Sequence, residues 1–278
     1  MIIIDYSQVC IAAMFANFQG NDQSLDYFRH LVLNSIRRIK TKFHNHGELV
    51  LAIDSKESWR KKVFPYYKAN RAKSREESAI DWPLVYQNIA KIKDELDEFF
   101  PYKVIEIKGA EADDVIGTLV KHLNPEPVVI ISADKDFIQM QRWPNVTQYD
   151  PIRDRYVEGN GSDYLFEHVI KGDSGDGIPS IRSGDAFLVE KIRQKPVTAK
   201  WIAELKAMNQ TQLENHLKEA GILKYYERNK QIIDLDYTPA DISEAIIAKY
   251  NAPVKSGDIY KYMIDNQLKI LFDYINEF

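Results

Sequence analysis

Short runs of apolar, largely β-branched residues alternate with stretches of helical periodicity along the first half of the chain. The apolar runs cover Ile2 to Ile4, Leu49 to Ile53, Val104 to Ile107 and Val128 to Ile131. Continuous apolar runs are typical of strands buried on both faces, and helical segments between them are typical of crossover connections. We therefore expect an α/β fold whose central, mostly parallel sheet is flanked by helices.

Two of the intervening segments carry clear signs of a helix start. Ser24 precedes a segment whose apolar residues recur at three- and four-residue steps as far as Ile39, and Asp81 precedes a similar segment that runs as far as Leu96. Ser and Asp are favoured N-cap residues because their side-chain oxygens accept the unpaired N–H groups of the first turn. We expect one helix after each of these residues.

The pattern changes after about Pro151, where the strand signals fade and short amphipathic segments follow one another. Helices are expected over Tyr164 to Ile170, Ala186 to Ile192, Thr198 to Met208, Gln212 to Ala220 and Asp241 to Tyr250. We therefore divide the chain into an α/β core over residues 1–150 and a helical C-terminal region over residues 151–278.

The composition of the 278-residue chain, 45% hydrophobic and 28% charged, is that of an ordinary globular protein. A single cysteine, Cys10, excludes an internal disulfide framework and a Cys-based zinc cluster. The chain shows neither a basic targeting segment nor an apolar run of membrane-spanning length, so we expect a cytoplasmic protein without membrane contact. A net charge of −4 argues against a generic nucleic-acid binder, so the position of the charges matters more than their sum.

Carboxylates collect where the predicted strands end. In open α/β sheets the carboxyl ends of the strands face the ligand crevice. Five groups of acids are expected to converge there: Asp5; Asp54; Glu111, Asp113 and Asp114; Asp134 and Asp136; and Asp173 and Asp176. A lone Asp after a strand is usually a helix cap, and Asp114 fits that interpretation. Five matching groups favour metal binding instead.

So many like charges need a cation, because each close pair costs about 1 to 4 kcal/mol. Oxygen ligands with no His or Cys beside them in the sequence select Mg²⁺ or Mn²⁺ rather than zinc. The grouping of the acids suggests two ions, which can clamp the attacking and leaving oxygens of a phosphodiester displacement. The sequence therefore predicts a site for two Mg²⁺ ions, with Mn²⁺ as a substitute.

A cationic, aromatic stretch follows Asp54 directly. Its members are Lys56, Trp59, Arg60, Lys61, Lys62, Phe64, Tyr66, Tyr67, Lys68, Arg71, Lys73 and Arg75. This interleaving suits a single nucleic-acid strand, since cations follow the phosphates and rings stack on the bases. The alternative is a solvated amphipathic helix whose aromatic rings complete the core. The loop that begins at Lys171 and Gly172 is a weaker candidate for phosphate contact through its backbone N–H groups.

Taken together, these motifs resemble the 5′ nuclease superfamily of flap endonucleases and, within it, the ribonucleases H of T-even phages. The matching segments are residues 4–8, 53–54, 59–71, 111–114, 132–137, 171–173 and Asp176. The similarity spans nearly the whole chain. It implies a PIN-like nuclease core with a helical arch or clamp over residues 56–78, and a helix–loop–helix over about 164–192 that grips duplex DNA.

The resemblance also implies roles for individual residues. The first metal would be surrounded by Asp5, Asp54, Glu111, Asp113 and Asp134, and the second completed by Asp136, Asp173 and Asp176. The catalytic set would be Asp5, Asp54, Glu111, Asp113, Asp134, Asp136 and Lys68, and Asp114 is included among the metal ligands. The nucleic-acid contacts would be Trp59, Arg60, Tyr67, Lys68, Arg71, Lys73, Arg75, Lys171 and Gly172.

The implied activity is that of a metal-dependent 5′ to 3′ exonuclease and flap endonuclease. Its substrates would be DNA and RNA:DNA with 5′ ends, flaps or forks, and its role the removal of RNA primers in replication, in the cytoplasm of an infected host if the chain is phage-encoded. The alternative is a junction-binding replication factor that has lost turnover. We expect a monomer, with the C-terminal helices as a candidate docking region for a single-stranded DNA-binding protein.

Two departures limit what the resemblance implies. The chain begins only four residues before Asp5, which leaves no room for a clamp-binding extension, so association with a sliding clamp is not expected. Cellular relatives follow the last acidic pair with a Gly-Ile-Gly hairpin, whereas here Pro179 leads to Ser180 and Ile181. The sequence therefore does not predict whether this loop binds a monovalent ion.

Overall fold

The computed structural model describes residues 1–16, 24–71, 80–187, 192–255 and 257–278. Its centre is a six-stranded sheet, formed within these residues, with the strand order β3-β2-β1-β4-β5-β6. The strands are β1 (Ile2–Asp5), β2 (Leu49–Ile53), β3 (Lys103–Glu106), β4 (Val128–Ile131), β5 (Val146–Asp150) and β6 (Arg155–Val157). The pairs among β1 to β5 are parallel, and β6 runs antiparallel to β5. The predicted mostly parallel sheet is confirmed.

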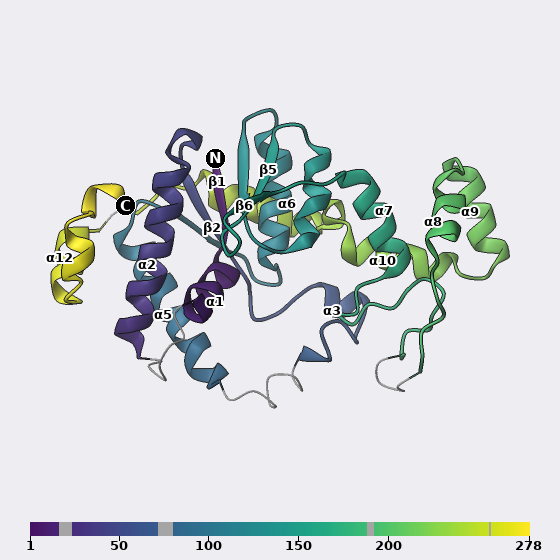
Figure 1. Ribbon diagram of the computed structural model, residues 1–278, viewed down its shortest axis with the longest axis horizontal. Coiled ribbons are helices and arrows are strands. Elements are labelled where there is room, and N and C mark those ends of the chain that lie inside the picture. The colour runs from purple at the N-terminus through teal and green to yellow at the C-terminus, as the bar shows by residue number, and fades with distance from the viewer. Residues whose placement is uncertain (17–23, 72–79, 188–191, 256) are drawn as a thin grey trace.

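Helices cover both faces of the sheet (Figure 1). The first face carries α1 (Tyr6–Ala16), α2 (Leu25–Lys42) and α5 (Trp82–Phe99), and the second carries α6 (Ala112–Leu123) and α11 (Ala240–Asn251). Side chains alternate across each strand, so Ile2 and Ile4 join the core of the first face and Ile3 joins that of the second. Ser24 and Asp81 cap α2 and α5 through their side chains, as predicted.

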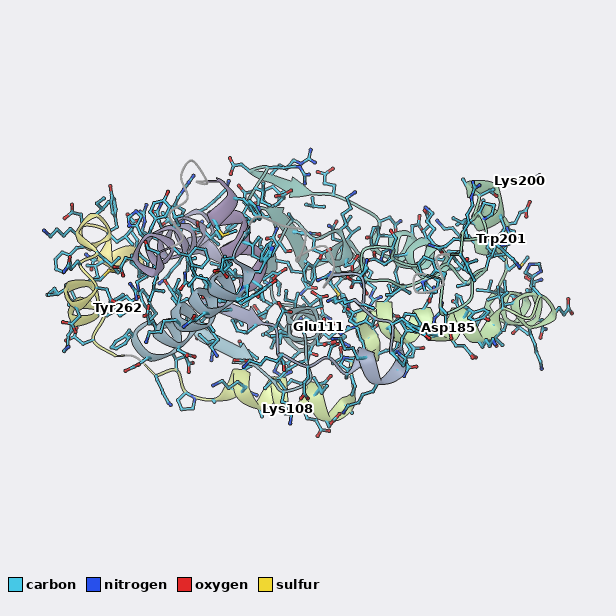
Figure 2. All side chains as sticks on the ribbon, turned by 90° about the horizontal axis from the view of Figure 1, so that it is seen from below. Lys108, Glu111, Asp185, Lys200, Trp201 and Tyr262 are labelled. Carbon is cyan, nitrogen blue, oxygen red and sulfur yellow. The ribbon has the colours of Figure 1, made fainter. Side chains whose placement is uncertain are left out.

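The C-terminal region is helical, as predicted, and extends to both ends of the molecule. Besides β6 and α11, its described elements are α7 (Gly161–Lys171), α8 (Ala199–Lys206), α9 (Gln210–Glu219), α10 (Leu223–Ile233), η3 (Leu235–Tyr237), α12 (Ile259–Asp265), α13 (Lys269–Phe272) and η4 (Ile275–Glu277). The helices α8 and α9 form a lobe at one end of the molecule, and α12 lies beside α2 at the other (Figure 1). The labelled side chains of Trp201 and Tyr262 mark these two ends in Figure 2, with Glu111 between them.

Several elements differ from the sequence prediction. The strands β5 and β6 were not predicted, because the sequence of β5 mixes polar and apolar residues. The helices α1, α10, α12 and α13 were also missed. The predicted helix over Ala186 to Ile192 falls largely outside the described residues, and Ala186 itself lies in a turn.

The predicted arch over residues 56–78 can be followed only in part. Its described residues, 56–71, contain the short helix α3 (Arg60–Val63) and turns, and residues 72–78 lie outside the described part of the chain. The remaining short elements are η1 (His44–His46) and η2 (Lys135–Arg142). In the described ranges, no helix has the length and apolar character needed to cross a membrane.

Candidate metal centre

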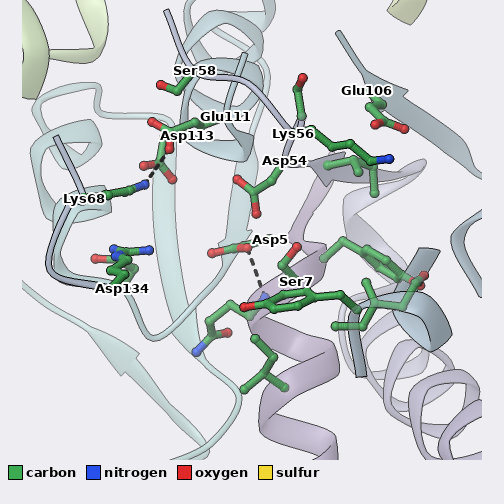
Figure 3. Close-up of a pocket in the computed structure, with 18 of the residues that line it drawn as sticks. Asp5, Ser7, Asp54, Lys56, Ser58, Lys68, Glu106, Glu111, Asp113 and Asp134 are labelled. Atoms are coloured by element: carbon green, nitrogen blue, oxygen red, sulfur yellow. Dashed lines mark hydrogen bonds and ion pairs between the residues drawn. The ribbon is translucent and has the colours of Figure 1, made fainter. Parts of the chain in front are cut away.

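Acidic side chains from both halves of the sequence meet in one cleft at the carboxyl edge of the sheet. The cleft has a volume of about 830 Å³. Its lining includes eight of the predicted carboxylates: Asp5, Asp54, Glu111, Asp113, Asp134, Asp136, Asp173 and Asp176. Figure 3 shows those of Asp5, Asp54, Glu111 and Asp113 turned toward a common space. The structure thus brings together acids that lie up to 171 positions apart, from residue 5 to residue 176.

Strand topology and local hydrogen bonds aim these carboxylates. Asp5 ends β1, and Asp54 directly follows the neighbouring strand β2. Asp54 accepts the N–H of Ala112, the first residue of α6, over 2.9 Å, which ties this acid to the helix that carries Glu111 and Asp113. Because parallel neighbouring strands end at the same edge, their terminal acids face the same crevice.

The loop after α7 delivers the last two acids. Gly172 ends this helix with a φ of 67°, and a Cβ there would lie 2.4 Å from the carbonyl oxygens of Ile178 and Pro179. Only glycine accommodates so close an approach of two backbones. The turn that follows is closed by Asp173, whose Oδ1 accepts the N–H groups of Gly175 and Asp176 over 2.7 and 3.2 Å.

Several carboxyl groups in the cleft hold their protons unusually tightly. Burial, reinforced by the charges of Asp54 and Asp134, raises the pKa of Asp5 to about 7. Burial, reinforced by Asp134, likewise raises the pKa of Asp136 to about 7. The pKa of Asp113 is also raised, chiefly by burial. Groups of this kind are ready to exchange protons for a divalent cation near neutral pH.

Basic side chains from the stretch after Asp54 close one side of the cleft. The ammonium of Lys68 lies 2.5 Å from Glu111 Oε1 and 3.7 Å from Asp176 Oδ2, and the guanidinium of Arg71 pairs with Asp176. Burial opposes ionisation of Glu111, but the charges of Lys68 and Arg60 outweigh it, so the pKa of Glu111 is lowered. Lys68 and Arg71 therefore lie where a phosphate next to the acids would meet them.

Asp114 corrects the sequence prediction. Its carboxylate was included among the metal ligands, but it does not line the cleft and is fully buried. Its oxygens accept the guanidinium N–H groups of Arg60 at 2.9 Å, the hydroxyl of Thr238 at 3.0 Å and the backbone N–H of Glu111 at 2.9 Å. With these partners Asp114 caps α6 and pairs with Arg60. The alternative interpretation of Asp114 as a helix cap is therefore the correct one.

Arg60 and Trp59 are a second correction. Both were predicted to contact nucleic acid, yet Arg60 is 2% exposed and Trp59 is 6% exposed. Arg60 also donates to the carbonyl of Ile232 over 2.8 Å, and the Trp59 indole N–H points at Asp114 over 3.2 Å. The start of the basic stretch is therefore anchored in the core, since an Arg–carboxylate pair compensates for the buried charge.

The other predicted nucleic-acid contacts have separate outcomes. Tyr67 is 2% exposed, so its ring cannot stack on a base; its hydroxyl lies 2.9 Å from Glu111 and 3.0 Å from Asp176 and shares its one proton between these two acceptors. The N–H of Gly172 donates to the carbonyl of His168 at the C-cap of α7, so the prediction that it donates to a phosphate is wrong. Lys171 is exposed and pairs with Glu167, whereas Lys73 and Arg75 lie outside the described residues.

Two residues of the site were missed by sequence reasoning. On α7, the hydroxyl of Tyr164 donates to Asp136 over 3.2 Å, and His168 Nε2 lies 3.3 Å from the same carboxylate. Their four-residue spacing on a predicted helix placed them on one face, but nothing local indicated that this face meets the acids. Asp5 also accepts the hydroxyl of Ser132 over 3.1 Å.

The chain matches known families along its whole length. The family described as "5'-3' exonuclease, N-terminal resolvase-like domain" matches residues 1–168, and the one described as "T4 RNase H, C terminal" matches residues 161–278. Ribonuclease H of Enterobacteria phage T4 is 35% identical over 99% of this chain and 95% of its own length. The 5'-3' exonuclease of Buchnera aphidicola is 28% identical, with 65% of each protein covered.

Solved structures share the fold. The bacteriophage T5 D15 flap endonuclease, in complex with DNA and metal ions, has a TM-score of 0.62 and 18% identity, with 96% of this chain and 97% of that chain covered. The T5 5'-exonuclease with bound zinc has a TM-score of 0.61 and 16% identity, with 96% of this chain and 98% of that chain covered. At this level of identity the likeness concerns the fold.

A parallel sheet whose carboxyl edge gathers acids in one cleft, in a chain that matches the 5′-3′ exonuclease family over residues 1–168, defines a metal-dependent 5′ nuclease. The chain belongs to the 5′-3′ exonuclease family, and its C-terminal region is of the T4 ribonuclease H type.

Proposed function

We propose that the protein hydrolyses phosphodiesters at the 5′ ends and flaps of DNA and RNA:DNA duplexes, with two Mg²⁺ ions that Mn²⁺ can replace, and so removes RNA primers in replication. The observation that carries this proposal is the convergence of eight carboxylates from five separate segments in one cleft. Carboxylate oxygens favour hard divalent cations. The relatives' names, ribonuclease H and flap endonuclease, support both parts of the proposed substrate range.

Individual residues would divide the work between holding the ions and orienting the substrate. The first ion would be surrounded, directly or through water, by Asp5, Asp54, Glu111, Asp113 and Asp134, and the second would be completed by Asp136, Asp173 and Asp176. When bound, two such metal ions supply an activated water and neutralise the charge that develops on the reacting phosphodiester. No side-chain nucleophile is required.

Lys68 and Arg71 would contact the phosphate beside the acids. Both cations already pair with cleft carboxylates, so an incoming phosphate would share or replace those contacts. Lys56 and Lys61 also line the cleft and are exposed, which suits contacts to flanking phosphates. These contacts would position the strand without selecting its sequence.

The two regions of the chain would contribute together to this activity. Residues 1–150 would form the catalytic core and residues 151–278 the duplex-binding region, with the segment about 164–192 as its helix–loop–helix. Asp173 and Asp176 reach the cleft from this second region, so duplex binding and metal binding would share one loop. A monomeric state, a cytoplasmic location and docking of a single-stranded DNA-binding protein on the C-terminal helices stay predictions.

A flap substrate labelled in turn at its 5′ and 3′ ends tests this proposal. With Mg²⁺ we expect short products released from the 5′ end, and with EDTA we expect an intact substrate that is still bound. Binding without cleavage in every divalent ion tried would support the alternative, a junction-binding factor that has lost turnover. The products from the two labels also separate stepwise exonuclease action from cleavage at the flap junction.

A further inference from the structure

A second, much smaller cavity adjoins the metal cleft. Its volume is about 10 Å³, close to the space that one water-sized sphere occupies. Its charged lining includes Asp136, Asp173 and Asp176, which also line the main cleft, and it adds His168, which does not. The guanidinium of Arg60 borders the cavity too, but it is paired with Asp114 and Glu111. The cavity therefore places an imidazole beside the acids expected to hold the second ion.

The donor atoms around this cavity have the spacing of a coordination shell. His168 Nε2 lies 3.3 Å from Asp136 Oδ1 and 3.6 Å from Asp173 Oδ2, and donor atoms of all three residues fall within 4.8 Å of one another. Ligands at about 2.1 Å from a tetrahedral ion lie about 3.4 Å apart. Although Nε2 is buried and near two carboxylates, it makes no well-directed hydrogen bond. A protonated imidazole would hold these atoms together as an ion pair, and a cation bound by the same three residues would take the place of that proton.

The position of the imidazole is fixed by its own helix. The ring of His168 stacks on that of Tyr164, with centroids 5.3 Å apart and planes inclined by 19°. Tyr164 in turn donates its hydroxyl to Asp136 over 3.2 Å. One helix face thus orients both the imidazole and one of the carboxylates, and such outer contacts are known to set the direction of metal ligands.

We propose that His168 Nε2 is a ligand of the second ion together with Asp136 and Asp173, so that this position prefers Mn²⁺, Co²⁺ or Zn²⁺ to Mg²⁺. An imidazole nitrogen binds these ions more strongly than it binds Mg²⁺, which prefers oxygen ligands in octahedral geometry. The first position, around Asp5 and Asp54, has only oxygen donors among the described residues that line the cleft. The inference rests on the proposed two-metal nuclease and gives its two positions different ion preferences.

Titration with Co²⁺, followed by visible absorption and calorimetry, tests this assignment. For the wild-type protein we expect a Co²⁺ site whose absorption is typical of mixed nitrogen and oxygen ligands. In His168→Gln we expect that absorption to be lost. We also expect Co²⁺ affinity to fall by at least about 10-fold, because loss of a residue that only supports a metal ligand already costs about 10- to 100-fold. His44→Gln, at an exposed histidine in η1, is the control and should bind like the wild type. An unchanged Co²⁺ spectrum and affinity in His168→Gln would overturn the proposal.

Pulsed electron paramagnetic resonance of the Mn²⁺-loaded wild-type protein gives an answer that needs no variant. Coupling to an imidazole nitrogen is expected, and a spectrum with oxygen and water ligands alone would contradict the assignment. The same wild-type preparation, assayed with Mg²⁺ before Mn²⁺ is added, should cleave a flap substrate if the nuclease proposal holds. Absence of cleavage by the wild-type protein would refute the proposed nuclease activity. Absence of nitrogen coupling alone would refute only the role of His168.

Discussion

The cost of gathering the acids is measurable at Asp5. This side chain is 7% exposed, and burial, with the charges of Asp54 and Asp134 added, raises its pKa to about 7. An unperturbed Asp has a pKa of about 3.9. The pKa of Asp5 therefore differs by about three units between the folded and unfolded protein, which corresponds to about 4 kcal/mol of folding free energy at about 1.36 kcal/mol per unit. This is an upper bound, because Asp5 shares its repulsion with its neighbours.

The sign of the effect follows from proton binding. Between about pH 4 and about pH 7 the folded state holds a proton on Asp5 that the unfolded state has released, so stability falls as the pH rises through this window. Asn carries no charge, and it can keep contacts to the N–H of Gln8 and the hydroxyl of Ser132. Allowing about 1 kcal/mol for a disturbed hydrogen bond, we expect Asp5→Asn to stabilise the metal-free protein by about 1 to 3 kcal/mol at pH 8.

Urea denaturation in EDTA at pH 8, 6.5 and 5 measures this difference directly. The gain should be largest at pH 8 and shrink toward pH 5, while Asp273→Asn, at an exposed position, should change little at any pH. With Mg²⁺ added, the wild type should recover stability that the variant does not, because the variant lacks a ligand. A variant that is less stable than the wild type at pH 8, or a gain that is equal at all three pH values, would refute the reasoning.

Four further substitutions test separate parts of the site. Asp134→Asn should abolish cleavage and leave duplex binding intact, as measured by gel shift in EDTA. Lys68→Ala should lower the cleavage rate by about 100-fold at saturating substrate, since a cation beside the reacting phosphate is removed. Arg71→Ala should weaken binding and reduce the slope of log affinity against log salt by about 1; an unchanged slope would exclude a phosphate contact. Arg60→Met should cost about 3 to 5 kcal/mol in urea denaturation, because Asp114 would stay buried without its partner.

The sequence predicted the parts of the fold that have a local signal. Apolar runs such as Leu49 to Ile53 are marked by their own composition, because strands of a parallel sheet are buried on both faces. The rule that strand ends face one crevice then places Asp5 and Asp54 together without any knowledge of contacts. A strand such as β5 carries a weaker signal, since it includes the polar residues Thr147 and Gln148.

The basic stretch shows what a local pattern leaves undecided. Exposed cations that follow phosphates and buried cations that pair with acids have the same residue types, and only the partner distinguishes them. For Arg60 the partner is Asp114, which is 54 positions away in the sequence. His168 was missed for the same reason, because its neighbour Asp136, 32 positions away in the sequence, becomes visible only when α7 is placed against η2.

The proposed nuclease activity depends on the uptake of divalent cations by the acids of the cleft. Isothermal calorimetry of the protein with Mg²⁺ and with Mn²⁺, in buffers of different ionisation enthalpy near pH 7, measures this uptake and the protons that accompany it. We predict saturable binding with release of protons, because Asp5 and Asp136 have pKa values of about 7 in the metal-free cleft. Absence of binding by either ion at millimolar concentration would contradict the metal centre and, with it, the nuclease mechanism.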